Sequence, residues 1–175
     1  MDLFQAIEAR SSYRGMYKSD PVPREDMNKI MQAGLDAPSG CNMQTTSLIG
    51  VDDPALIEAL GAALAKPNFG SAPAAIAVVT QHIISYGDTC FSVQDYAAAI
   101  ENMLLAVVAL GYASCWVEGY VVNHREVCER MSSILGLPEG HHLVAYLPIG
   151  RPAEEDKRAT KKAFAERTHF NGFGK

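Results

Sequence analysis

The sequence lacks the long apolar runs that mark membrane and secreted proteins. No run approaches the roughly 20 residues that a helix needs to cross a bilayer. The first ten residues, MDLFQAIEAR, have an acid at position two and no separate apolar core, unlike a signal peptide. We therefore expect a cytoplasmic protein with no membrane partner.

Cysteine and histidine are few, and their spacing does not suit a metal. None of the four cysteines forms a CxxC pair, and none of the five histidines lies in HExxH or at zinc spacing from a cysteine. In a chain without an export signal, such cysteines are expected to be reduced thiols. The sequence therefore predicts neither a disulfide framework nor a metal site.

Motifs of several large enzyme classes are also missing. No GxGxxG follows a strand pattern, so a Rossmann dinucleotide site is not expected, and there is no GxxxxGK[ST] phosphate loop or GxSxG elbow. The net charge is −5, with 15 basic and 20 acidic residues. A broad basic face for nucleic acid is therefore not expected.

The composition that is present fits a globular domain. The 175 residues are 48% hydrophobic and 20% charged, enough for one domain with a sizeable core. Without repeats or linkers, residues 1–175 are expected to form a single domain. Apolar periodicity and turn residues predict an α+β fold, with a proline- and glycine-rich loop at 66–73. The expected helices are 2–9, 23–35, 54–64, 92–112 and 124–137, and the expected strands are 46–51, 74–80 and 142–150.

Two segments suggest contact with a second molecule. The helix expected at 92–112 is apolar almost all round after Tyr96, and such a helix must be covered on every side. In so small a protein, part of that cover is expected from a second subunit. The charged tail also carries Phe164, Phe170 and Phe173, which favour docking over free disorder.

Four polar clusters interrupt the apolar scaffold: RSSYR at 10–14, APSGCNMQ at 37–44, WVEGY at 116–120 and GRP at 150–152. Arginine beside serine suits phosphate, because a planar fork of donors adjoins hydroxyl donors. Asparagine and glutamine can match the edge of a heterocycle. Taken singly, each cluster also has an ordinary explanation, such as surface ion pairs, a helix end or a strand exit.

In their order and spacing, these clusters resemble the FMN-dependent nitroreductase family over nearly the whole chain. That family has an R-[RH]-S-x-[RK] pattern in its first helix, then an A-P-S-x-x-N-x-Q loop. A long helix with D-x-x-x-A-x-x-N-x-x-L follows, here from Asp95, and then a tryptophan-containing turn and a final Gly-[YR]-P. The resemblance implies a nitroreductase-like α+β fold. A central mixed β-sheet would be flanked by helices, with a long buried central helix at a homodimer interface.

The resemblance also implies roles for the first and last clusters. Arg10 and Ser12 would hold the FMN phosphate, and Arg151 would supply a second cation to it. Arg14 would face O2 and N1 of the flavin ring, where a cation stabilises the anionic reduced flavin. Ser11 stands where the family has arginine or histidine, so one contact to the cofactor would be lost or shortened.

The two middle clusters would contact the ring. Pro38, Ser39 and Asn42 would line the isoalloxazine from the other subunit, and Gln44 would lie near the ribityl chain or the ring. Backbone N–H groups at 118–119 would lie near N5. The full set expected to bind the cofactor is Arg10, Ser11, Ser12, Arg14, Pro38, Ser39, Gly40, Asn42, Gln44, Glu118, Gly119, Gly150 and Arg151.

The expected function is an FMN-dependent NAD(P)H oxidoreductase. NADH or NADPH would reduce the flavin, and a small-molecule acceptor (a nitroaromatic, a quinone or an activated alkene) would then oxidise it in a ping-pong cycle. No catalytic side chain is assigned, because the cofactor carries the hydride chemistry. Thr45 and Thr46 replace the family's Pro-Trp, which favours a more open pocket. Two alternatives stay open: a non-catalytic flavin-binding protein, as a store or redox sensor, and a structural dimer without a cofactor.

Overall fold

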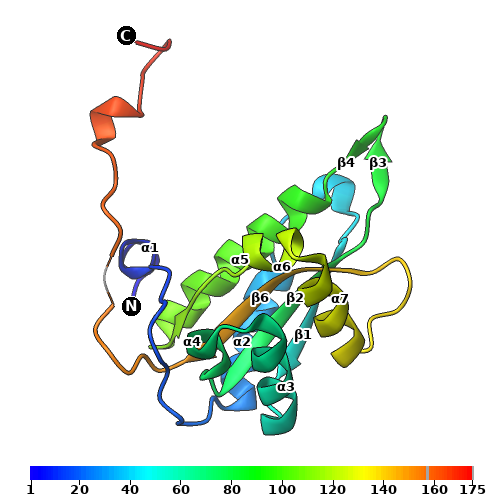
Figure 1. The fold of residues 1–175 in the computed structure, drawn as a ribbon. Helices are drawn as coiled ribbons and strands as arrows, with labels where there is room; N and C mark the ends of the chain where they lie inside the picture. The colour runs from blue at the N-terminus through cyan, green and yellow to red at the C-terminus, as the bar shows by residue number, and fades with distance from the viewer. Residues whose placement is uncertain (157, 175) are drawn as a thin grey trace.

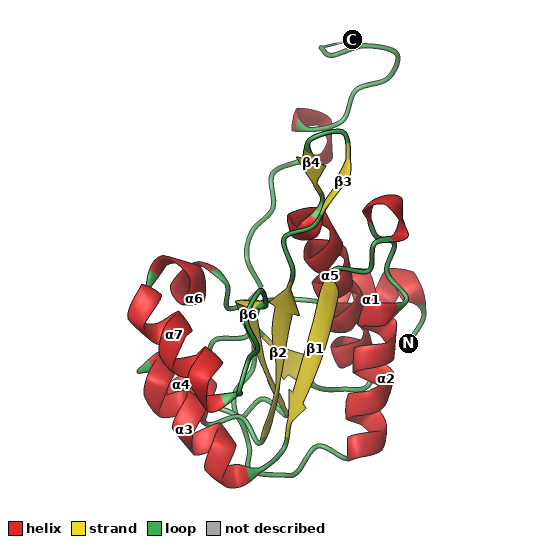
Figure 2. Cartoon of the chain, turned by 90° about the vertical axis from the view of Figure 1, so that its right-hand side faces the viewer, coloured by secondary structure: helices red, strands yellow, loops and turns green. Residues whose placement is uncertain are grey.

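A central sheet lies between two layers of helices in the computed structural model, which describes residues 1–156 and 158–174 (Figures 1 and 2). One face of the sheet carries α1, α2 and α5, and the other carries α3, α4, α6 and α7. The helices are α1 Leu3–Ala9, α2 Arg24–Leu35, η1 Gly40–Asn42, α3 Pro54–Leu64, α4 Pro67–Gly70, α5 Ser92–Ala109, α6 Gly119–Asn123, α7 Arg125–Ile134 and η2 Phe164–Glu166. The strands are β1 Thr46–Val51, β2 Ala74–Thr80, β3 Ile84–Tyr86, β4 Thr89–Cys90, β5 Ala113–Ser114 and β6 His142–Gly150.

The main sheet has the order β1-β2-β6-β5, and each of its described pairs is antiparallel. The expected α+β fold is confirmed, but the expectation of a mixed sheet is corrected. The physical reason lies in the connection between β1 and β2. The segment expected to be a loop at 66–73 contains α4, which packs back on α3, so the chain enters β2 beside the end of β1. A Cβ on Gly61 would lie 2.8 Å from the Cα of Gly70, so these two glycines permit the close crossing.

The core has two parts because β2 is buried on both faces. Ala74, Ile76 and Val78 pack with α2 and α5, whereas alternate residues of the strand pack with α3 and α7. Side chains alternate across a strand, so an unbroken apolar run marks a strand covered on both sides. This explains why the predicted strands at 74–80 and 142–150 have the predicted bounds, since β2 and β6 are both buried along nearly their whole length. The predicted strand at 46–51 also has its predicted bounds, although β1 is only partly buried.

Helix α5 lies along the sheet and packs against α2. The Asn102 side-chain amide donates to the carbonyl of Ala33, 3.0 Å away, and ties the two helices together. The outer face of α5 is incompletely covered by this chain: Val93 is 57% exposed, and Ala98, Leu105 and Val108 are partly exposed. The cover expected on every side therefore does not come from the described residues of one chain.

Two segments extend from the body. The β3–β4 hairpin projects beyond the sheet, and the C-terminal tail extends away from the other elements (Figure 1). The tail phenylalanines Phe164, Phe170 and Phe173 are 75%, 76% and 93% exposed. Docking of this tail on another molecule stays a prediction.

Candidate functional site

Tyr13, at the centre of the first cluster, anchors it to the protein. Its side chain is 2% exposed, and its backbone N–H donates to the carbonyl of Ser114 over 2.9 Å. Its hydroxyl donates to the carbonyl of Met16 at 2.6 Å and accepts from the backbone N–H groups of Ala153 and Glu154 at 3.2 and 3.3 Å. One buried side chain thereby fixes the segment 10–17 and brings the start of the C-terminal tail beside it. Sequence reasoning assigned Tyr13 no role, although an aromatic residue among polar ones was the available signal.

A cationic pocket of about 380 Å³ lies between this cluster and the tail. Its lining residues are Arg10, Ser11, Ser12, Arg14, Arg158, Ala159 and Lys161. The four residues of the first cluster that were predicted to bind the cofactor therefore line one pocket. The two cations from the tail, Arg158 and Lys161, were not predicted to line it. They are far from the first cluster in the sequence, and only the fold brings them to this pocket.

Few carboxylates balance the charge of the cationic pocket. Arg10 Nε lies 3.3 Å from Glu101 Oε1, and the Ser11 hydroxyl contacts the carboxylate of Asp156. Arg14 Nη1 donates to the carbonyl of Ser12 at 3.1 Å. Among residues 1–156 and 158–174, Arg10 is the only cation of this pocket in an ion pair. The ordinary explanation of the cluster as surface ion pairs therefore does not account for its other cations.

The last cluster lies apart from the cationic pocket in this chain. The guanidinium carbon of Arg151 is 5.3 Å from the centre of the Tyr112 ring, and Arg151 does not line the cationic pocket among its described residues. Gly150 is buried at the exit of β6, where a Cβ would lie 2.7 Å from Cδ of Pro73. Convergence of Arg10 and Arg151 on one phosphate stays a prediction.

The second cluster forms a tight loop between α2 and β1. Cys41, Asn42 and Gln44 have φ angles of 52°, 55° and 50°, a conformation that side chains rarely adopt. The Ser39 hydroxyl accepts from the backbone N–H of Gln44 at 3.0 Å. Pro38, Ser39 and Gln44 line a separate small pocket of about 180 Å³. Within one chain, this small pocket of the second cluster is therefore separate from the cationic pocket.

The third cluster connects β5 to α6. Val117 exchanges backbone hydrogen bonds with Tyr146 at 3.0 and 3.1 Å, so the turn is fixed to β6. The Tyr96 hydroxyl donates to Glu118 Oε1 at 2.7 Å. Burial, reinforced by the adjacent Glu118 carboxylate, raises the pKa of Tyr96 to about 12. Gly119 begins α6 directly after this carboxylate.

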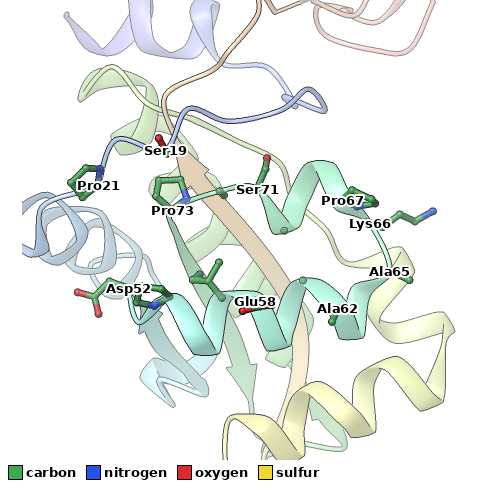
Figure 3. A pocket seen from close by; sticks show the side chains of 15 residues that line it. Ser19, Pro21, Asp52, Glu58, Ala62, Ala65, Lys66, Pro67, Ser71 and Pro73 are labelled. Atoms are coloured by element: carbon green, nitrogen blue, oxygen red, sulfur yellow. The ribbon is translucent and has the colours of Figure 1, made fainter.

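A groove larger than the cationic pocket lies elsewhere (Figure 3). It measures about 750 Å³ and runs along α3 and α4 toward Ser19, Pro21 and Pro73. Its lining is mostly apolar, and none of the predicted cofactor residues belongs to it. Size therefore does not identify the functional site, whereas the unbalanced cations of the cationic pocket suit a specific anionic ligand.

The described residues, 1–156 and 158–174, contain no group of three or more His, Cys, Asp or Glu side chains placed to hold a metal ion. Within the same residues, no helix has the length and apolarity required to span a bilayer. Neither finding bears on the cationic pocket.

The family model described as the Nitroreductase family matches residues 7–80 and 62–151, which include all four clusters except Pro152. The chain belongs to the nitroreductase family. It is 32% identical over 158 residues to an Archaeoglobus fulgidus protein named as an NADH dehydrogenase/NAD(P)H nitroreductase, with 88% of this chain and 87% of the relative covered.

Solved structures of nitroreductases share the fold. An FMN-dependent nitroreductase from Clostridium difficile is 28% identical, with a TM-score of 0.79 over 97% of this chain and 99% of that chain. A nitroreductase with bound FMN from Bacteroides fragilis is 29% identical, with a TM-score of 0.75 over 97% and 98% of the two chains. The predicted family is therefore confirmed, as is the nitroreductase-like fold.

Proposed function

We propose that the protein is an FMN-dependent NAD(P)H oxidoreductase. The observation that carries this proposal is the cationic pocket, built by the first cluster and the tail in a chain of the nitroreductase family. The names of its relatives support the same activity, since they describe NAD(P)H nitroreductases and an FMN-dependent nitroreductase.

The donor set of the cationic pocket fits the phosphate of FMN. Arg10 offers a planar fork of N–H donors and Ser12 offers a hydroxyl, which together can hold a phosphate. Arg158 and Lys161 add charge from the tail. These residues would hold the phosphate end of the cofactor.

The ring of FMN would extend from the cationic pocket toward Glu118 and Gly119. When bound, FMN would supply the hydride acceptor and donor, which no side chain can replace. The backbone N–H groups at 118–119 would orient the ring, and the Tyr96 hydroxyl would hold the Glu118 carboxylate in place. Arg14 would stabilise negative charge on the pyrimidine side of the reduced ring.

A second copy of the chain would complete the ring site. Pro38, Ser39, Gly40, Asn42 and Gln44 line or adjoin a hollow distinct from the cationic pocket, so in a single chain they do not meet the first cluster. Helix α1 adds an exposed apolar surface, since Leu3, Phe4 and Ile7 are 62%, 80% and 50% exposed. Together with the outer face of α5, this surface would form the interface of a homodimer.

One flavin face would serve the two substrates in turn. NADH or NADPH would bind over the ring and leave as the oxidised nucleotide, and a nitroaromatic, quinone or activated alkene would then occupy the same place. The sequence contains no Rossmann motif, so no separate nucleotide site is expected.

Steady-state kinetics test this order of events. Parallel lines in double-reciprocal plots of rate against donor and acceptor concentrations are expected for a ping-pong enzyme. Intersecting lines would contradict a shared site. Protein that takes up FMN but does not turn over with any of the three acceptor classes would favour the flavin store or sensor.

A further inference from the structure

The loop of the second cluster holds an uncommon concentration of backbone strain. Cys41, Asn42 and Gln44 all have positive φ angles, although none of them is glycine. Such conformations persist only where surrounding contacts fix them, and they cluster at functional sites. Some group outside the loop must therefore hold it in shape.

Asp95 on α5 makes that contact at both ends of the loop. Its side chain is 4% exposed, yet it is a carboxylate. Oδ1 accepts from the backbone N–H of Gly40 at 2.7 Å, and Oδ2 accepts from the hydroxyl of Thr45 at 2.7 Å. The two hydrogen bonds enclose the three strained residues between them.

Packing against α5 restricts the same loop. A Cβ on Gly40 would lie 2.4 Å from Cβ of Phe91, so the loop backbone touches the residue that precedes α5. The carbonyl of Thr45 accepts from Gln81 N at 3.1 Å and from the Thr80 hydroxyl at 3.3 Å. Thr45 is thus fixed to the sheet, while Gly40 depends on Asp95 and Phe91.

We propose that Asp95 is a positioning residue for flavin binding. Its carboxylate sets the strained backbone of residues 40–44, and that backbone places Pro38, Ser39 and Asn42 against the isoalloxazine. A buried carboxylate costs desolvation free energy unless hydrogen bonds compensate it, and here both oxygens are used to shape one loop. The inference rests on the proposed FMN site. Asp95 lines the same small pocket as Pro38, Ser39 and Gln44, and its role there is to hold the loop backbone.

Asp95→Ala, with the full chain reconstituted with FMN or riboflavin, tests the proposal. Both hydrogen bonds are lost, so we expect the dissociation constants of FMN and riboflavin to rise alike, by about tenfold to a hundredfold. An equal rise is expected because the loop contacts the ring and not the phosphate. In Asp95→Asn, the amide oxygen can still accept from the backbone N–H of Gly40, and the amide nitrogen can donate to the hydroxyl oxygen of Thr45. This variant should therefore bind both flavins within about threefold of the unaltered chain.

Leu60→Ala provides the matched control. Leu60 is fully buried in the opposite half of the core, so its truncation lowers thermal stability without touching the loop. We expect Leu60→Ala to lower the melting temperature and leave both dissociation constants unchanged. Unchanged affinity in Asp95→Ala would overturn the proposal. The proposal would also be overturned if Leu60→Ala, at equal destabilisation, lost as much flavin affinity as Asp95→Ala. An Asp95→Asn variant that binds flavin as weakly as Asp95→Ala would overturn it as well.

Amide hydrogen exchange separates this inference from the proposed function. In the flavin-free protein, the N–H groups of Gly40 and Gln44 should exchange faster in Asp95→Ala and in Thr45→Val than in the unaltered chain. Unchanged exchange would overturn the role of Asp95 even if FMN binds. If the unaltered chain binds neither flavin, the proposed function fails, while exchange still reports whether Asp95 holds the loop.

Discussion

Tyr13 shows how one buried side chain can organise polar residues around it. Its hydroxyl contacts the backbone of Met16, Ala153 and Glu154, so the N-terminal cluster and the beginning of the tail are fixed to each other. The polar residues of the first cluster could be predicted from the sequence, because arginine beside serine has a specific chemistry. Arg158 and Lys161 could not, since only long-range contacts bring the tail to the cluster.

Replacement of Arg10 tests the phosphate end of the site. A hydrogen bond to a charged group contributes about 1.5–3 kcal/mol, so Arg10→Ala should weaken FMN by roughly tenfold to a hundredfold. Riboflavin lacks the phosphate and should be affected far less. Fluorescence titration with both flavins measures the difference, and equal losses for the two would place the phosphate elsewhere.

Arg158→Ala and Arg151→Ala extend this comparison. Arg158 lines the cationic pocket and should behave like Arg10, with a selective loss of FMN affinity. The family resemblance predicts the same selectivity for Arg151, which lies over Tyr112 in this chain. Loss of FMN affinity in Arg151→Ala alone would show that the tail cations do not reach the phosphate.

At the scale of elements, local signals were sufficient for the strands but not for their directions. Apolar runs bounded by turn residues predicted β1, β2 and β6 with their observed bounds. The antiparallel pairing of β1 and β2 depends on α4, which packs on α3 and brings the chain back beside β1. The close approach of Gly61 to Gly70 that this packing requires has no local signature in the sequence. The loop at 37–44 was predicted, but its anchoring by Asp95 depends on a contact 55 residues away.

The contact between Asp26 of α2 and Tyr112, which follows the end of α5, makes stability depend on pH. The Tyr112 hydroxyl donates to Asp26 Oδ2 at 2.9 Å and, with Lys29, lowers the pKa of this carboxyl below its usual 3.8. A depressed pKa stabilises the fold above the unfolded value, and this contribution is lost as the pH falls through the folded pKa. Tyr112→Phe should therefore be less stable than the unaltered chain at neutral pH, with the difference shrinking below about pH 4.

Denaturant unfolding at neutral and acidic pH measures this effect. Tyr86→Phe is the matched control, because the same hydroxyl is removed from a side chain that is 71% exposed on the β3–β4 hairpin. Its stability should follow that of the unaltered chain at each pH. A deficit in Tyr112→Phe that is independent of pH would show that packing, and not the Asp26 hydrogen bond, is responsible.

For the whole molecule, the proposed site depends on two copies. The exposed residues of α1, the outer face of α5 and the tail phenylalanines would be covered in a homodimer, and stable interfaces of this kind bury more than about 2,000 Å². Sedimentation should therefore show a dimer at about micromolar concentration. Phe4→Asp should favour the monomer and weaken flavin binding. A well-folded monomer of the unaltered chain that binds FMN would contradict the shared site.

The central claim is that bound FMN passes electrons from NAD(P)H to an acceptor. Its most direct test is an anaerobic titration of the FMN-loaded protein, followed by visible absorbance. We expect NADH or NADPH to bleach the flavin without any acceptor present, and subsequent addition of a nitroaromatic or a quinone to restore the colour. A bound flavin that neither nucleotide bleaches would contradict the account.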